Sequence, residues 1–161
     1  MKLLKTLIHQ FTNNEIDRST VLKEICISIC RILNVSRASL WDFENDFKQI
    51  RCVALYDHRT NEYSEGAIIH ESTIPPYFES ILRDGSIVAS DARNNSITAV
   101  LTEPYFEPLD IYSLLDHIVF NNGEKVAVLC CEHCGEIRQW SSEDESLLRT
   151  MSAIVSILYK F

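Results

Sequence analysis

The chain has 161 residues and a formal net charge of −8, and hydrophobic residues make up 46% of it. That length suits one domain with a single well-formed core, and a content of only four Gly and four Pro excludes a disordered or fibrous chain. The acidic balance, with Lys and Arg scattered along the sequence, disfavours partners such as nucleic acid or an anionic membrane surface.

The amino-terminal part predicts two amphipathic helices or one bent helix, because apolar residues recur at helical spacing on both sides of a polar break at 12–17. These apolar positions are Leu3, Leu4, Leu7, Ile8 and Phe11, then Val21, Leu22, Ile25, Ile29, Ile32 and Leu33. Residues 1–16 would form a leading helix that also suits a dimer contact or a linker. No run approaches the about 20 apolar residues of a membrane span or the about 7 to 15 of a signal-peptide core, so we expect a cytoplasmic chain with no membrane segment.

A change of period from helical spacing to two predicts a first β-hairpin after these helices. Ser39 and Trp41 alternate with their neighbours, Asn45–Asp46 follows, and residues 49–56 form a second extended run. Residues 57–111 come next and are the least periodic part of the chain, so they predict loops and short helices, with one helical signal at 77–83.

The second hairpin is the strongest local signal. Residues 114–120 and 125–131 predict strands, and Asn122–Gly123 between them is typical of a type I′ turn, which requires positive φ. A closing helix is expected to run to Phe161, capped by Ser141 or Ser142. Its apolar stripe comprises Leu147, Leu148, Met151, Ile154, Val155 and Leu158. The stripe suits either the domain's own sheet or a dimer partner, and the sequence leaves both open.

Six cysteines raise the question of disulfides, metal and redox chemistry. Cys26 and Cys30 lie one helical turn apart, a spacing that favours buried apolar positions in a reducing compartment over a secreted disulfide framework. Cys130, Cys131, His133 and Cys134 offer ligand types that zinc and iron prefer, but Cys130 and Cys131 point to opposite faces of a strand. We therefore expect no metal site and interpret these cysteines as small core residues, leaving a redox role open.

The order of elements is similar to that of the GAF domain family. The segments that carry this resemblance are Arg37–Phe43, Leu114–Ile118, Val128–His133 and Arg138–Glu145. It covers about Asp17 to Phe161 and implies a single domain, 1–161, with an α+β sandwich fold. In that fold a central antiparallel sheet carries the terminal helices on one face, and short helices and loops cover a pocket on the other.

The resemblance also implies a function. GAF domains are input modules of histidine kinases, diguanylate cyclases, phosphodiesterases and transcription regulators, and they bind cyclic nucleotides, bilins, haem or other small molecules. We expect a sensory module, homodimeric through its terminal helices, that binds a small molecule non-covalently and signals to an output domain in its own or a partner chain, as in two-component systems. The alternatives are a ligand-free dimerisation module and a thiol-based enzyme like free methionine sulfoxide reductase.

Two ligands of the family are disfavoured by the sequence. Cyclic-nucleotide-binding members carry an Asn-Lys pair, an aromatic residue and then Asp-Glu; Trp140 and Asp144–Glu145 match the second half, but Glu132–His133 replaces the first pair. A covalently attached bilin needs a cysteine in the middle segment, and residues 57–111 contain none. The reductase depends on cysteines in the same segment, so we assign no catalytic residue and expect no enzyme.

Haem ligation through His58, His70 or His117 lacks a distinctive signature, so the cofactor stays unknown. The predicted ligand-binding residues come from the first hairpin and the irregular middle segment. They are Ser39, Trp41, Tyr77, Phe78, Asp91, Tyr105 and Phe106. Small-molecule sites are concave and mostly apolar, but the same aromatics could fill a core and leave no cavity. A cavity of roughly 300 Å³ beneath residues 77–105 would distinguish the two hypotheses.

Overall fold

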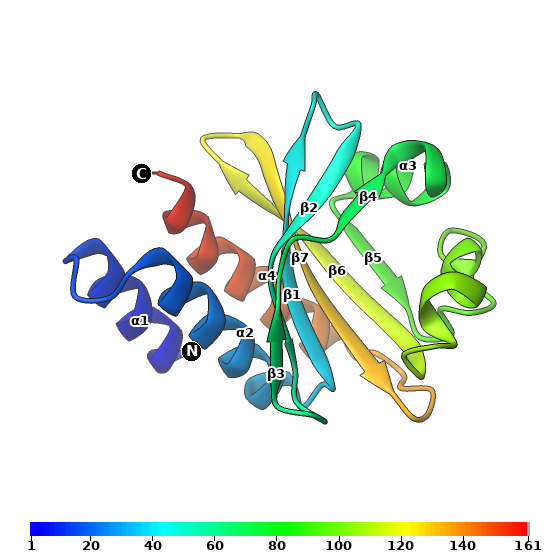
Figure 1. The fold of residues 1–161 in the computed structure, drawn as a ribbon, viewed down its shortest axis with the longest axis horizontal. Coiled ribbons are helices and arrows are strands. Elements are labelled where there is room, and N and C mark those ends of the chain that lie inside the picture. The colour runs from blue at the N-terminus through cyan, green and yellow to red at the C-terminus, as the bar shows by residue number, and fades with distance from the viewer. Residues whose placement is uncertain (161) are drawn as a thin grey trace.

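One antiparallel sheet divides the protein into two layers, as Figure 1 shows. The computed structural model describes residues 1–160. The strands follow the order β3-β2-β1-β7-β6-β5, and β4 pairs with the first residues of β2. Their bounds are β1 Arg37–Glu44, β2 Gln49–Asp57, β3 Glu62–Ser64, β4 Ile68–His70, β5 Ser86–Ala89, β6 Ile111–Asn121 and β7 Glu124–Cys134. The antiparallel sheet with flanking helices confirms the predicted α+β class.

Both predicted hairpins are confirmed and form the centre of the sheet. β1 pairs with β2 on one side and with β7 on the other, while β6 and β7 pair along almost their whole length. Asn121 pairs with Glu124, and the two residues between them, Asn122 and Gly123, have φ of 52° and 79°. These positive values are the reason for Asn-Gly at this turn.

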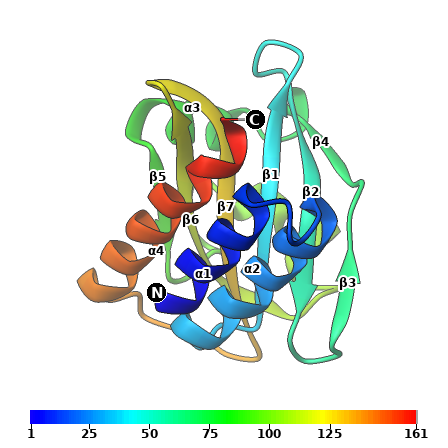
Figure 2. The same ribbon diagram turned by 90° about the vertical axis from the view of Figure 1, so that its left-hand side faces the viewer.

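Three helices from the two ends of the chain cover one face of the sheet (Figures 1 and 2). They are α1 Lys2–Thr12, α2 Arg18–Leu33 and α4 Ser142–Val155, and α4 continues as a short 3-10 helix, η4 Ser156–Tyr159. The first two are separate helices because the chain turns between them, where Asp17 accepts a hydrogen bond from the Thr20 amide at 2.8 Å and caps α2. The expected end of the closing helix at Phe161 lies outside the described residues.

The start of α4 decides between the two predicted caps. Ser141 is the cap: its hydroxyl accepts from the Asp144 amide at 3.1 Å, and the Asp144 carboxylate accepts from the Ser141 amide at 3.0 Å. This reciprocal arrangement satisfies two amide groups that would otherwise have no partner at the helix end.

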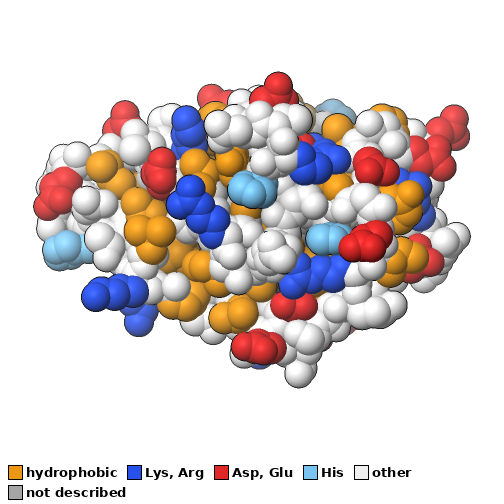
Figure 3. All heavy atoms as spheres, turned by 90° about the horizontal axis from the view of Figure 1, so that it is seen from below, with side chains coloured by type: hydrophobic (Ala, Val, Ile, Leu, Met, Phe, Trp, Pro, Cys, Tyr) orange, Lys and Arg blue, Asp and Glu red, His pale blue; other side chains and the backbone are white. Residues whose placement is uncertain are grey.

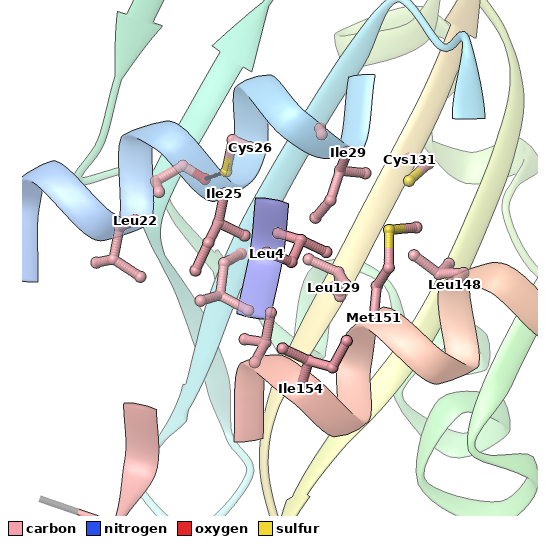
Figure 4. Packing of buried hydrophobic residues seen from close by; sticks show 14 of the residues in the cluster. Leu4, Leu22, Ile25, Cys26, Ile29, Leu129, Cys131, Leu148, Met151 and Ile154 are labelled. Atoms are coloured by element: carbon pink, nitrogen blue, oxygen red, sulfur yellow. Dashed lines mark hydrogen bonds between the residues drawn. The ribbon is translucent and has the colours of Figure 1, made fainter. Parts of the chain in front are cut away.

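The helix-side core lies between these helices and the sheet (Figure 4). Leu4 of α1, Ile29 of α2 and Met151 of α4 are all fully buried there, against Leu129 of β7. Four apolar positions of α4, namely Leu148, Met151, Ile154 and Val155, are buried in the domain itself. The predicted stripe of the closing helix therefore covers the domain's own sheet.

The middle segment adds the outer strands of the sheet and covers its opposite face, and it holds more regular structure than the sequence predicts. It contains β3, β4 and β5 as well as α3 Pro75–Asp84, two 3-10 helices, η1 Glu71–Thr73 and η2 Ala99–Leu101, and one turn of π-helix, η3 Thr102–Phe106. The expectation of loops and short helices alone was incomplete, because strands of three or four residues are too short to show a period.

The surface carries charges of both signs. On the face shown in Figure 3, acidic and basic side chains are interspersed, with hydrophobic side chains between them. Among residues 1–160, no helix combines the length and apolar character needed to cross a lipid bilayer.

Candidate functional site

A small cavity lies between the sheet and the cover formed by α3, η2 and η3. Its volume is about 30 Å³, enough for one or two water molecules. We name it the sheet cavity; it is lined by Trp41, Ile50, Ile69, Ile74, Tyr77, Leu101, Tyr105, Phe106, Leu114, Asp116, Cys130 and Glu132. The volume is far below the roughly 300 Å³ of an ordinary small-molecule site, so in this conformation the aromatic side chains fill most of the space.

Four of the seven predicted ligand-binding residues line this cavity: Trp41, Tyr77, Tyr105 and Phe106. Trp41 belongs to β1, whereas the other three come from α3 and η3, so the fold brings together residues that are far apart in the sequence. Their rings form an apolar wall around the polar residues that line the rest of the cavity.

The other three predicted residues lie elsewhere. Ser39 is buried behind Trp41 and accepts a hydrogen bond from its indole Nε1 at 2.8 Å. Phe78 packs in the same core, edge-on to the rings of Tyr77 and Phe43, but does not line the cavity. Asp91 lies outside it, where a carboxylate oxygen accepts from the Asn94 side chain at 3.0 Å. Proximity in sequence to the aromatic residues was a poor guide to the position of Asp91.

Asp116 is a cavity residue that the sequence analysis did not identify. It lies on β6 and is only 2% exposed, and the Tyr77 hydroxyl donates to its Oδ2. Its other oxygen, Oδ1, has no hydrogen-bond partner in the part of the chain that the structure describes. Burial raises the pKa of Asp116 to about 7, against the lowering effect of the Cys130 thiol and the Tyr77 hydroxyl.

Glu132 is the second buried carboxylate of the cavity, on β7 and 1% exposed. Its Oε1 accepts from Arg37 Nε at 3.0 Å and from the Tyr105 hydroxyl at 3.2 Å. Its Oε2, like Asp116 Oδ1, has no partner within residues 1–160. Burial raises the pKa of Glu132 above its usual value, although the guanidinium of Arg37 opposes this.

Arg37 lies between the cavity and an open groove on the outside of the domain. Its Nη1 lies 3.4 Å from Asp57 Oδ2, and the same oxygen is 2.8 Å from Arg59 Nη2. Arg37, Asp57 and Arg59 line the groove, whereas Glu132 and Tyr105 line the sheet cavity. The contacts of Arg37 with Glu132 and Tyr105 therefore separate the cavity from the groove.

One sequence signal could have identified these two acids. In β6, Asp116 has the same strand parity as Leu114, and in β7, Glu132 has the same parity as Cys130, so both carboxylates fall on the apolar face that covers the cavity. A charged residue on an otherwise apolar strand face is rare unless it is paired or functional.

The cysteine cluster does not converge. Cys130 lines the cavity, while its neighbour Cys131 belongs to the helix-side core, which confirms that they point to opposite faces. Burial raises the pKa of both thiols well above the usual value. No group of three or more His, Cys, Asp or Glu side chains suited to holding a metal ion is found among the described residues.

The partial cyclic-nucleotide motif also lies away from the cavity. Trp140 packs into the helix-side core, and Asp144 serves the capping of α4 and pairs with Arg138 Nη2 at 3.1 Å. Both residues therefore have structural roles on the opposite side of the sheet. The histidines considered for haem, His58, His70 and His117, are not among the residues lining the cavity.

Comparisons with known proteins agree with this fold. The family model described as the GAF domain matches residues 17–158, so the chain belongs to the GAF domain family. No curated protein sequence matches it significantly.

Among solved structures, the phycocyanobilin-bound GAF domain from a cyanobacterial phytochrome is similar at a TM-score of 0.77 and 14% identity, covering 98% of this chain and 92% of that one. Free methionine-R-sulfoxide reductase from Neisseria meningitidis, in complex with its substrate, gives 0.74 and 10%, covering 98% and 84%. The GAF domain from Acinetobacter phosphoenolpyruvate-protein phosphotransferase gives 0.71 and 14%, covering 97% and 91%. At these identities the likeness shows the fold alone.

Proposed function

We propose that this GAF domain is a sensory module without catalytic activity that takes a small molecule into the sheet cavity and relays its presence to the terminal helices and an output domain. The observation that carries the proposal is the composition of the cavity. Four aromatic rings surround a space into which two buried carboxylates, Asp116 and Glu132, each bring an oxygen without a partner among the described residues. A mostly apolar site with a few convergent polar groups is the usual form of a ligand pocket.

A ligand larger than a few atoms requires the cover to move, because the cavity holds only about 30 Å³. The movable part is η2 with η3, a 3-10 helix followed by one turn of π-helix; irregular helical turns of this kind often occur at functional sites. Tyr105 in η3 donates to Glu132 and accepts from Arg37 Nη2 at 3.3 Å. Displacing Tyr105 would open the cavity to the groove.

The relay follows from the position of β7. Neighbouring residues of this strand, such as Cys130 and Cys131, belong alternately to the cavity side and the helix-side core. A ligand that moves the cavity side of β7 also moves residues in contact with α2 and α4. In this proposal, the signal that the output domain receives is a change in the relative position of the terminal helices.

The small cavity volume favours a second candidate function instead, a ligand-free dimerisation module with a filled pocket. Homodimerisation through the terminal helices is part of both proposals. Leu3 of α1 is 50% exposed, so it is the apolar residue on these helices best placed to contact a partner. Sedimentation velocity tests this: Leu3→Glu should convert a dimer to a monomer, and a monomeric parent protein would contradict the dimer.

The ligand proposal is tested by NMR on the two tryptophans. Protein purified from its host is first analysed by native mass spectrometry for a bound small molecule, which is then added to the ligand-free protein. We expect the indole signal of Trp41, which lines the cavity, to shift, while that of Trp140 on the other side of the sheet does not. Trp140→Phe assigns the two signals, and Asp91→Asn should bind normally. If no molecule co-purifies, a library of metabolites is screened in the same way. A library that leaves the indole signal of Trp41 unchanged would favour the ligand-free module.

A further inference from the structure

We infer that the ligand of the sheet cavity is a small organic cation with N–H donors, an ammonium or amidinium group held by Asp116 and Glu132. The inference rests on the proposed function, because it names the chemical class of molecule that the same site takes. It begins with the two carboxylate oxygens that have no partner within residues 1–160, Asp116 Oδ1 and Glu132 Oε2.

Ionised carboxylates accept hydrogen bonds and do not donate them. What the two free oxygens lack is therefore a donor, and each belongs to a side chain at most 2% exposed that lines the cavity. A buried acceptor left without a donor is unfavourable, so an occupant that brings two or more N–H groups gains more here than one that brings none. An ammonium group brings three and an amidinium group four.

The two carboxylates are close enough for one small group to contact both. In the β6–β7 register Leu114 is opposite Glu132, and Asp116 is opposite Cys130. Asp116 and Glu132 are thus diagonal neighbours on one face, with Cα atoms about 7 to 8 Å apart. Because both side chains line the same cavity, a group of two to four heavy atoms between them matches its volume of about 30 Å³.

The charges around the cavity favour a cation. Arg37 pairs with Glu132 and Asp57, and Asp57 also pairs with Arg59, so two positive charges are matched by two negative charges. Asp116 forms no ion pair within residues 1–160, so its charge, when it is ionised, is not matched by this network. An anion at the same place would meet Asp116 and Glu132 at short range, which is unfavourable in a poorly hydrated site.

The aromatic wall supports the same class of ligand. Trp41, Tyr77, Tyr105 and Phe106 line the cavity together with the two acids. The faces of such rings attract cations, which adds to the attraction of the two carboxylates for a positively charged group. An amidinium group is planar and can in addition stack on a ring.

Binding of a cation should release a proton near neutral pH. Burial raises the pKa of Asp116 to about 7, so the free protein holds this carboxyl partly protonated, whereas the cation requires the carboxylate. The other titratable groups facing Asp116 are Tyr77 from α3 and Cys130 and Glu132 from β7. Burial raises the pKa of Tyr77 and of Cys130 well above the usual values, so both stay neutral in this range.

The test is a titration of the ligand-free protein with methylammonium chloride and guanidinium chloride, at about 1 to 100 mM because so few heavy atoms give only weak binding. The signal is the Trp41 indole resonance, with Trp140 as the internal reference. Tetramethylammonium chloride matches the charge without N–H donors, acetamide has N–H donors without charge, and sodium acetate supplies an anion. We expect saturable shifts of Trp41 with the first two salts only.

The pH dependence and two variants complete the test. The dissociation constant for methylammonium should fall about tenfold from pH 6 to pH 8, as the competing proton leaves Asp116. Asp116→Asn should weaken binding at least tenfold and remove this pH dependence, while Asp91→Asn should change neither. Circular dichroism checks that both variants are folded.

The outcomes separate this inference from the proposed function. Binding of acetamide or acetate at Trp41, or cation binding that Asp116→Asn leaves unchanged, would overturn the inference and leave a ligand pocket of another chemistry. If no compound in the series shifts Trp41, the inference also falls. The proposed function is decided separately, by the molecule that co-purifies with the protein and by the metabolite library.

Discussion

At the scale of single residues, Asp116 combines two properties that are costly to a folded protein. Its carboxyl group is almost completely buried, and one of its oxygens has no partner among the residues that the structure describes. Removing a charge from water is unfavourable unless the charge is paired, so the folded protein resists ionisation of this group. Such residues tend to mark functional sites, and the stability of the protein should report on this one.

We predict that the stability cost of Asp116 depends on pH. Its folded pKa of about 7 lies above the about 3.9 of an unfolded Asp, so its contribution to stability is complete below pH 4 and is lost as pH rises through 7. Asp116→Asn does not titrate and should gain on the order of 3 kcal/mol relative to the parent protein between pH 5 and pH 8. Urea unfolding at the two pH values measures this. Asp91→Asn is the control, and parallel profiles for parent and Asp116→Asn would contradict the prediction.

The cysteines allow a second prediction at this scale. All six are free and buried, and burial raises the pKa of each, including Cys134, the most exposed at 9%. Because the thiolate is the reactive form, a chromogenic disulfide reagent at pH 8 should react slowly with the native protein and at once in urea. Rapid reaction of one or two native thiols would instead support the thiol-based enzyme that the middle segment disfavours.

At the scale of elements, α4 offers a matched pair of neighbouring serines. Ser141 caps the helix and Ser142 is its first residue, with no capping role. Ser141→Ala should destabilise the protein by about 1 kcal/mol, because the Asp144 amide loses its acceptor, and Ser142→Ala should have little effect. Equal effects in urea unfolding would show that the cap contributes nothing.

The elements that the sequence predicts best are those whose signals are local and long. The second hairpin follows from Asn122–Gly123 between two apolar runs, and the closing helix from its apolar stripe. The strand β5 was not predicted, because its four residues are defined by pairing with β6, a long-range contact that no local period reveals.

The candidate site was predicted only in part for the same reason. The sequence identified the aromatic residues that line the cavity, since apolar rings in an irregular segment are conspicuous. Asp116 and Glu132 were missed because their position depends on the register between β6 and β7 and on which face of the sheet α3 and η3 cover. Neither is visible in a single strand.

At the scale of the whole molecule, the sheet separates two apolar cores that should respond differently to substitution. Leu129 is fully buried in the helix-side core and does not line the cavity. Leu129→Ala should therefore cost about 2 to 5 kcal/mol of stability, while the cavity at the Trp41 indole keeps its ligand. Ile137→Ala is the control, since this isoleucine is 46% exposed and should cost little. Loss of ligand binding by folded Leu129→Ala would contradict this prediction.

The alternation of side chains along β7 has one further consequence. β7 pairs with β1 on one edge and with β6 on the other, and its successive side chains point alternately into the two cores. Cys130 on the cavity side and Cys131 in the helix-side core are joined by a single peptide unit, so the two cores are linked directly through the backbone of β7. A ligand that displaced the side chains on one face of β7 would therefore also displace those packed on its other face.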